Sequence, residues 1–201
     1  MTLSELADST ESEHRTRRLL SLFRLITGHM IARGPDAQEC VLHLAGRVGA
    51  IGRAAAAPTA GGTDLELLVL DELLAEGVPR ASTVLTGPEV RLNCKSAELM
   101  RLAIHELVTN AIKFGALSES QSQLRVIWWI TGPACSRLHF EWAEDGVGAA
   151  AETRRHTGFG SHVVKRLIAS ELHGSGDMQF FAKGVLCIIE IPSSEALLHN
   201  G

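Results

Sequence analysis

Three polar residues stand at helical spacing in an otherwise largely apolar stretch of the sequence. Glu106, Asn110 and Lys113 are separated by four and three positions, so a helix would place them on one face. An amide oxygen suits Mg²⁺, which prefers oxygen ligands and usually keeps waters while it bridges substrate phosphates. Lys113 could neutralise a phosphate, and Glu106 could orient a metal-bound water or polarise an attacking nucleophile. The same spacing is also typical of an ordinary solvated helix face, so other motifs must decide.

Two further motifs follow in the chain, and each suits another part of a nucleotide. Glu144 stands at the end of a predicted strand, and Gly146 and Gly148 behind it would let the backbone approach a ligand closely. A carboxylate at that place could accept a hydrogen bond from an exocyclic amine such as that of adenine. The run Gly158-Phe159-Gly160-Ser161 then opens a predicted helix, whose free N–H groups and dipole attract phosphate. Together with Asn110, these motifs predict a site for ATP and Mg²⁺.

Hydrophobic periodicity predicts the elements that would position these residues. Apolar residues recur at helical intervals in residues 14–32 and, after a Gly-Pro-Asp turn, in residues 37–57. Proline and glycine residues that break helices follow the second predicted helix, and they indicate a domain boundary between residues 1–60 and 61–201. In the second part, helices are predicted at 64–76, 96–114 and 158–172, and strands at 84–92 (with Cys94), 124–130, 137–142, 178–181 and 185–191. Helices and antiparallel strands without regular βαβ alternation predict an α+β fold.

The first two helices form a hairpin that would expose much of its apolar face if it stood alone. Pairing of two hairpins would bury this face in a four-helix bundle, which predicts a homodimer. Packing of the hairpin against the rest of the same chain would bury the face as well, so the sequence leaves both arrangements open.

Composition excludes some classes of protein. The formal net charge of −4 gives no indication of binding to nucleic acid or to an anionic membrane surface. The four cysteines lack metal-ligand spacing and are expected to be free thiols. No apolar run approaches the roughly 18 residues that a membrane span needs, and the acidic N-terminus is unlike a secretory signal. We therefore expect a cytoplasmic protein or a soluble part of a larger one.

The motifs resemble those of the HWE family of sensor histidine kinases. The string HELVTNAIKFGALS, residues 105–118, closely resembles the family's N-box. The family is named for a histidine in that box and a Trp-x-Glu motif, which here are His105 and Trp142-Ala143-Glu144, and GFGS looks like its glycine box. Residues 13–20 resemble its H-box, in which the histidine is the phosphoacceptor. The resemblance extends over residues 13–192 in the family's order.

This resemblance implies a fold, an activity and a set of site residues. The fold would be a helical dimerisation domain followed by a GHKL-type α/β sandwich that binds ATP. The activity would be phosphorylation of a histidine by ATP, followed by transfer to an aspartate in the receiver domain of a response regulator. A sensor domain would be missing here or lie on another protein. The implied site residues are His14 as phosphoacceptor, Asn110 on Mg²⁺ with Glu106 beside it, Lys113 near the phosphates, Glu144 at the adenine, and Gly146, Gly148, Gly158, Gly160 and Ser161 around the nucleotide.

The H-box departs from the family pattern and leaves two alternatives. Family H-boxes commonly have Lys-Asn where this chain has Arg17-Arg18, so an amide that could orient the acceptor imidazole is absent. The first alternative is a histidine phosphotransfer protein with a degenerate ATP site, but the polar residues of the ATP motifs are retained. The second alternative is an anti-sigma-type nucleotide-binding regulator, which needs no acceptor histidine. The hairpin that carries His14 argues against this class.

Overall fold

The computed structural model describes most of the chain, which divides into two compact units, Met1–Ala55 and Ala56–Gly201. The predicted phosphoacceptor, His14, lies outside the described residues. The described residues are 16–18, 20–24, 26–28, 37–56, 61–79, 83–118, 122–132, 136–146, 159–181 and 184–198.

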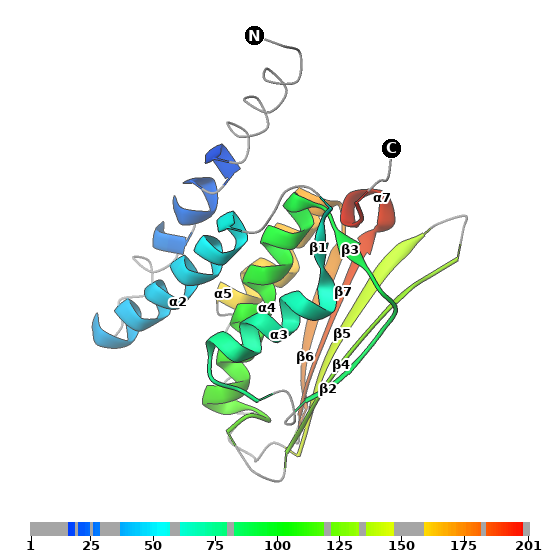
Figure 1. Cartoon of the computed structure of the whole chain (residues 1–201). Coiled ribbons are helices and arrows are strands. Elements are labelled where there is room, and N and C mark those ends of the chain that lie inside the picture. Colours follow the sequence, from blue (N-terminus) through cyan, green and yellow to red (C-terminus); the bar gives the residue numbers. More distant parts are fainter. Residues whose placement is uncertain are drawn as a thin grey trace. The chain divides into compact units, whose positions relative to one another are not determined.

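The described residues of the first unit are helical. Residues 16–18, 20–24 and 26–28 lie in helix, and α2 comprises Ala37–Ala56 (Figure 1). Arg53 in the last turn of α2 interacts favourably with the negative end of the helix dipole. These stretches fall within the two helices that the hydrophobic periodicity predicts. The pairing of hairpins into a dimer stays a prediction.

A five-stranded sheet forms one layer of the second unit. Along β4 (Gln123–Ile130), the side chains of Leu124, Val126 and Trp128 are buried and alternate with more exposed ones, because successive residues of a strand point to opposite faces. The edge strand β2 (Thr83–Thr86) pairs in parallel with β4, and all other neighbouring strands of this sheet are antiparallel. In the order of the sheet, the strands are β2 (Thr83–Thr86), β4 (Gln123–Ile130), β5 (Arg137–Asp145), β7 (Gly184–Pro192) and β6 (Ser175–Phe181).

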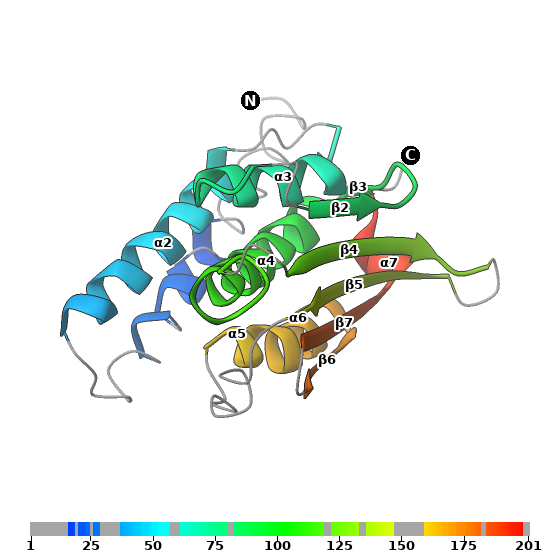
Figure 2. The same cartoon turned by 90° about the horizontal axis from the view of Figure 1, so that it is seen from below.

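Helices form the other layer and cover one face of this sheet (Figure 1 and Figure 2). Helix α3 (Leu65–Ala75) begins at a side-chain cap, in which Asp64 accepts a hydrogen bond from Leu67 N at 2.9 Å. Helix α4 (Cys94–Phe114) begins in the same way, because Asn93 accepts a hydrogen bond from Ser96 N at 2.9 Å. No helix in the described part of the chain is long and apolar enough to cross a membrane. The helices are α3 (Leu65–Ala75), α4 (Cys94–Phe114), α5 (Phe159–His162), the π-helical turn η4 (Val163–Leu167), α6 (Ile168–Leu172) and α7 (Ser193–Ala196).

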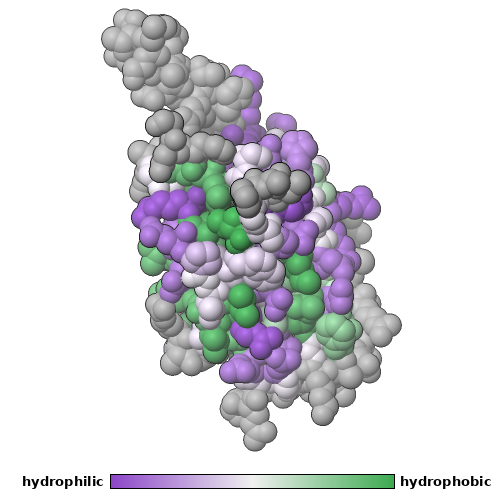
Figure 3. Space-filling model, turned by 90° about the vertical axis from the view of Figure 1, so that its right-hand side faces the viewer, coloured by the Kyte–Doolittle hydropathy of each residue, from purple (hydrophilic) through white to green (hydrophobic). Residues whose placement is uncertain are grey.

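The core lies between the two layers, and most residues on the opposite face of the sheet are half-buried or exposed. Large side chains such as Phe140, Trp142 and Phe159 are fully buried in the core. On the opposite face, Trp129 of β4 is partly exposed and stacks on His139 of β5 with ring centroids 5.0 Å apart. Figure 3 shows hydrophobic and hydrophilic residues intermixed on the side that it views.

The segment predicted as one strand at 84–92 is divided in the structure. Its first half is β2, whereas its second half is β3 (Arg91–Leu92), which pairs with β1 (Thr63–Asp64) in a separate two-stranded sheet. Gly87 lies between the two halves, and a side chain at this position would overlap the ring of Trp128. The indole Nε1 of Trp128 donates a hydrogen bond to Pro88 O at 2.8 Å. The prediction that Cys94 belongs to a strand is wrong, because the capped helix α4 begins there.

Candidate nucleotide-binding site

The long helix α4 carries the polar residues of the N-box on one side. Glu106 is buried and Asn110 is half-buried one turn later. Gly160, in the first turn of α5, lies directly against them: an added Cβ would stand 2.9 Å from Glu106 Cβ and 3.5 Å from Asn110 Nδ2. Any side chain at position 160 would therefore push α5 away from α4. The structure thus brings together residues from two motifs that lie about fifty positions apart in the chain.

The other predicted phosphate contacts lie near the ends of the same elements. Lys113 is exposed in the last turn of α4, and Ser161 is half-buried in α5. Gly146 follows β5 with φ of +81°, a conformation that glycine adopts readily. The remaining predicted nucleotide contacts, Gly148 and Gly158, lie outside the described residues.

The carboxylate of Glu144 is buried and held from two directions. Its Oε1 accepts a hydrogen bond from Trp142 Nε1 at 2.9 Å, and its Oε2 accepts one from the backbone N of Ala116 at 2.8 Å. Burial raises the pKa of Glu144 above the ordinary 4.5, while the Trp142 and Ala116 hydrogen bonds act in the opposite direction. Each oxygen keeps lone-pair capacity for a further donor.

The end of α4 is shaped to receive this carboxylate. Gly115 is the C-cap of α4, and its N–H donates to Ala111 O at 3.0 Å. A side chain at Gly115 would overlap Glu144 Oε2. No role was predicted from the sequence for Gly115 or for Trp142. Two signals were present: a residue two positions before Glu144 on a strand points to the same face, and a glycine directly behind a helix often marks its end.

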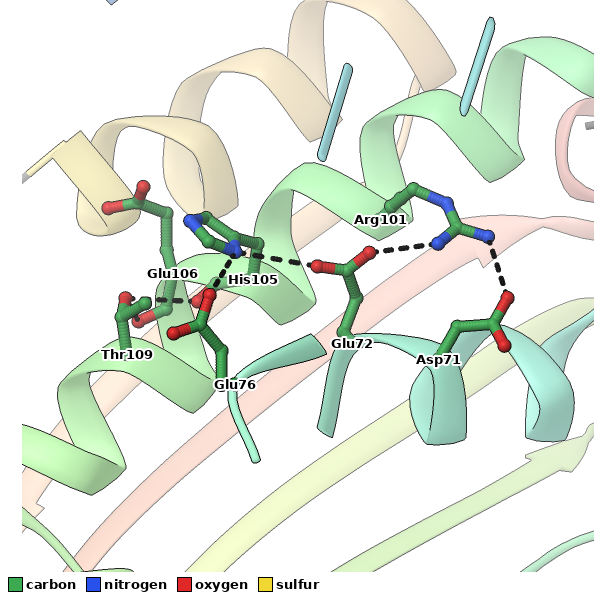
Figure 4. Close-up of polar contacts among 7 residues, drawn as sticks. All are labelled: Asp71, Glu72, Glu76, Arg101, His105, Glu106 and Thr109. Atoms are coloured by element: carbon green, nitrogen blue, oxygen red, sulfur yellow. Dashed lines mark hydrogen bonds and ion pairs between the residues drawn. The ribbon is translucent and has the colours of Figure 1, made fainter. Parts of the chain in front are cut away.

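A group of charged side chains joins α3 to α4 (Figure 4). Arg101 Nη1 donates to Glu72 Oε1 at 2.8 Å, and Arg101 Nη2 lies 3.4 Å from Asp71 Oδ2. His105 Nδ1 lies 3.4 Å from Glu72 Oε2 and 3.7 Å from Glu76 Oε1, but neither contact has hydrogen-bond geometry. The side chains at the centre of this group are buried, with exposed fractions of 0% for Glu72 and 5% for Arg101.

This group positions the polar face of α4. His105 directly precedes Glu106, so the contacts with α3 and the polar face occupy neighbouring sides of one helix turn. The hydroxyl of Thr109 donates to the carbonyl oxygens of His105 at 3.0 Å and Glu106 at 3.1 Å, within the same turns. The rotation of α4 about its axis is therefore fixed by buried contacts on one side and by Gly160 on the other.

Sequence comparison shows which known proteins are similar to this chain. The chain is 30% identical over 193 residues to blue-light-activated histidine kinase 1 of Erythrobacter litoralis, and the match covers 92% of this chain and 52% of that protein. A blue-light-activated histidine kinase of Rhizobium johnstonii is 29% identical over 191 residues, with the same coverage of 92% and 52%. The chain is a homologue of these histidine kinases over most of its length. This match confirms the resemblance that the sequence motifs indicate, and no family model matches the chain. This histidine kinase homologue spans about half the length of the curated relatives.

Solved structures of a histidine kinase share the fold. The histidine kinase domain of the EL346 blue-light activated histidine kinase from Erythrobacter litoralis matches with a TM-score of 0.56 at 19% identity, covering 92% of this chain and 91% of that one. A longer structure of EL346 matches with a TM-score of 0.59 at 17% identity, covering 90% and 60%. This likeness confirms the predicted α+β fold, which is consistent with a GHKL-type domain.

Proposed function

We propose that this chain is the catalytic core of an ATP-dependent protein histidine kinase of a two-component system. Its His14 would take the γ-phosphoryl group of ATP and pass it to an aspartate of a response regulator. The observation that supports this proposal most strongly is the arrangement along α4. Glu106 and Asn110 meet Gly160 on one stretch of the helix, and the helix ends against the buried acceptor Glu144. One helix thereby offers groups for both ends of a nucleotide.

The base would bind at the Glu144 end. A buried carboxylate that keeps acceptor capacity suits the exocyclic amine of adenine. Gly146 and Gly148 would let the backbone pass close to the ring and the sugar. Buried polar groups in proteins usually have hydrogen-bond partners, so the amine of a bound adenine would use the remaining acceptor capacity of the Glu144 carboxylate.

The phosphates and the metal ion would bind at the other end of the site. The amide oxygen of Asn110 would hold Mg²⁺, whose other ligands would be phosphate oxygens and waters, as is usual for this ion. Bound there, the ion would neutralise charge on the phosphates. Lys113 and the N–H groups around Gly158, Gly160 and Ser161 would contact phosphate oxygens. In the described parts of the chain, no group of three or more His, Cys, Asp or Glu side chains forms a metal cage.

Phosphoryl transfer would rely mainly on positioning. A neutral imidazole nitrogen of His14 attacks the γ-phosphorus in line, a nitrogen–phosphorus bond forms, and the bond to the β–γ bridging oxygen breaks to release ADP. Glu106 would accept a hydrogen bond from the imidazole and so polarise the nucleophile. Alignment of the two reactants contributes much of the rate. The hairpin would pair in a homodimer, which would place His14 near the nucleotide of its own or the partner subunit.

Incubation with γ-labelled ATP and Mg²⁺ tests the proposal directly. The wild-type chain is compared with His14→Gln, Asn110→Ala and the control His173→Asn, which replaces an exposed histidine at the end of α6. The expected result is an acid-labile label on the wild type and the control and none on the other two variants. ATP binding without any label would favour the phosphotransfer protein, and labelling of a partner protein by His14→Gln would favour the anti-sigma type.

A further inference from the structure

We propose that Trp142 is a positioning residue for base recognition. Its indole N–H, together with the N–H of Ala116, fixes the Glu144 carboxylate so that only acceptor positions remain for the base, which selects adenine over 6-oxopurines. This inference rests on the proposed function, because it takes Glu144 as the group that contacts the base. It concerns the specificity of that site, for which the proposed function gives no determinant beyond Glu144 itself.

The geometry around the carboxylate carries the proposal. Trp142 and Glu144 are two positions apart on β5 and therefore point to the same face of the sheet. The indole bond to Oε1 is 2.9 Å long and is buried, so water does not compete for it. The Ala116 bond to Oε2 is 2.8 Å long and comes from a different element, the segment behind α4. Two donors on two oxygens fix both the position and the rotation of the carboxylate.

The neighbours of Glu144 make these two donors important. In the sheet, the residues directly opposite Glu144 are the apolar Leu124 on β4 and Val185 on β7. The absence of a side chain at Gly115 lets the end of α4 approach so closely that its backbone can donate. In such surroundings an ionised carboxylate depends on specific hydrogen bonds, because burial alone favours its protonated form.

The protonation state of the carboxylate decides which base it accepts. An ionised carboxylate offers only acceptors, so it pairs with the 6-amino group of adenine and is repelled by the 6-carbonyl oxygen of hypoxanthine or guanine. A protonated carboxyl could donate to that carbonyl oxygen instead. Sites that are built to hydrogen-bond a substrate N–H discriminate strongly against an analogue that lacks it. Loss of the Trp142 donor should therefore weaken adenine binding and relax the selectivity against 6-oxopurines.

The test compares Trp142→Phe with the matched control Trp128→Phe in the full chain. Trp128 is also buried, and its indole N–H donates at 2.8 Å to the carbonyl oxygen of Pro88, outside the site. Both variants lose one indole hydrogen bond and the same part of the ring. The dissociation constants for ATP and inosine triphosphate with Mg²⁺ are measured by calorimetry, and KM and kcat by autophosphorylation. Glu144→Gln serves as the reference for lost selectivity.

Trp142→Phe is expected to lower the ATP preference over inosine triphosphate by about tenfold or more, since a hydrogen bond to a charged group contributes that much. KM for ATP should rise while kcat at saturating ATP stays within about twofold. Trp128→Phe should leave the preference unchanged. If Trp142→Phe does not fold, the comparison is made with benzothienylalanine at position 142, which keeps the ring shape and lacks the N–H.

An unchanged preference in both tryptophan variants, with a lost preference in Glu144→Gln, would overturn the inference and leave the proposed function intact. A wild-type chain that does not bind ATP would instead overturn the proposed function. An equal loss of preference in Trp142→Phe and Trp128→Phe would also contradict a positioning role, because it would show a general effect on the sheet.

Discussion

Replacing Arg101 with methionine should destabilise the second unit by about 3–5 kcal/mol, the usual effect of removing one partner from a buried ion pair. The guanidinium lies 2.8 Å from Glu72 Oε1, and the exposed fractions of the two side chains are 5% and 0%. Methionine keeps most of the aliphatic stem, so little packing is lost. His105 Nδ1 lies 3.4 Å from the same carboxylate without hydrogen-bond geometry and does not replace the guanidinium. The main effect is thus the loss of the buried ion pair between Arg101 and Glu72.

Urea unfolding followed by circular dichroism measures this effect. The control is Lys165→Met, which removes the partner of Asp177 at a similar distance of 2.9 Å but with side-chain exposed fractions of 44% and 54%. That exposed pair should contribute less than about 1 kcal/mol. The double variant Glu72→Met with Arg101→Met should regain most of the lost stability, because apolar replacements of a buried pair are often neutral. Equal and small effects of Arg101→Met and Lys165→Met would refute the reasoning.

Three further outcomes are expected. Gly160→Ala should weaken ATP binding several-fold, because its Cβ would stand 2.9 Å from Glu106 Cβ and push α5 away from α4, whereas Gly132→Ala, with nothing within 4 Å, should have no effect in the same titration. Because burial raises the pKa of Glu144 above 4.5, its carboxylate becomes protonated at a higher pH than an ordinary glutamate, and ATP affinity should fall from that higher pH as the pH is lowered. In Glu144→Gln, the pH dependence of ATP affinity should come only from titration of the ATP phosphates. Burial raises the pKa of the Cys187 thiol to about 12, so mass-spectrometric mapping after alkylation at pH 8 should find Cys187 modified only in urea.

Much of the fold follows from local signals in the sequence. The helix predicted at 96–114 begins at Cys94 in the structure, and the helix predicted at 64–76 is α3 with Asp64 as its cap. Such elements carry their own periodicity and capping residues. The pairing of Thr63–Asp64 with Arg91–Leu92 was not predicted, nor was the parallel pairing of β2 with β4. Two-residue strands have no periodicity, and their partners lie far away in the chain.

The candidate site was predicted in part for the same reason. Glu106 and Asn110 follow from helical spacing, and the structure adds the contact of both with Gly160. The hydrogen bond between Trp142 and Glu144 could have been expected from their spacing on a strand. The donation from Ala116 N could not, because it depends on where the end of α4 meets β5 in the folded unit.

The most direct test of the central proposal is to locate the phosphoryl group after incubation with ATP and Mg²⁺. Tandem mass spectrometry of peptides kept at alkaline pH, where phosphohistidine survives, would assign the modified residue. Autokinase activity predicts a single phosphorylated position, His14, in the wild-type chain and none in Asn110→Ala. Phosphorylation on another residue, or none despite ATP binding, would contradict it.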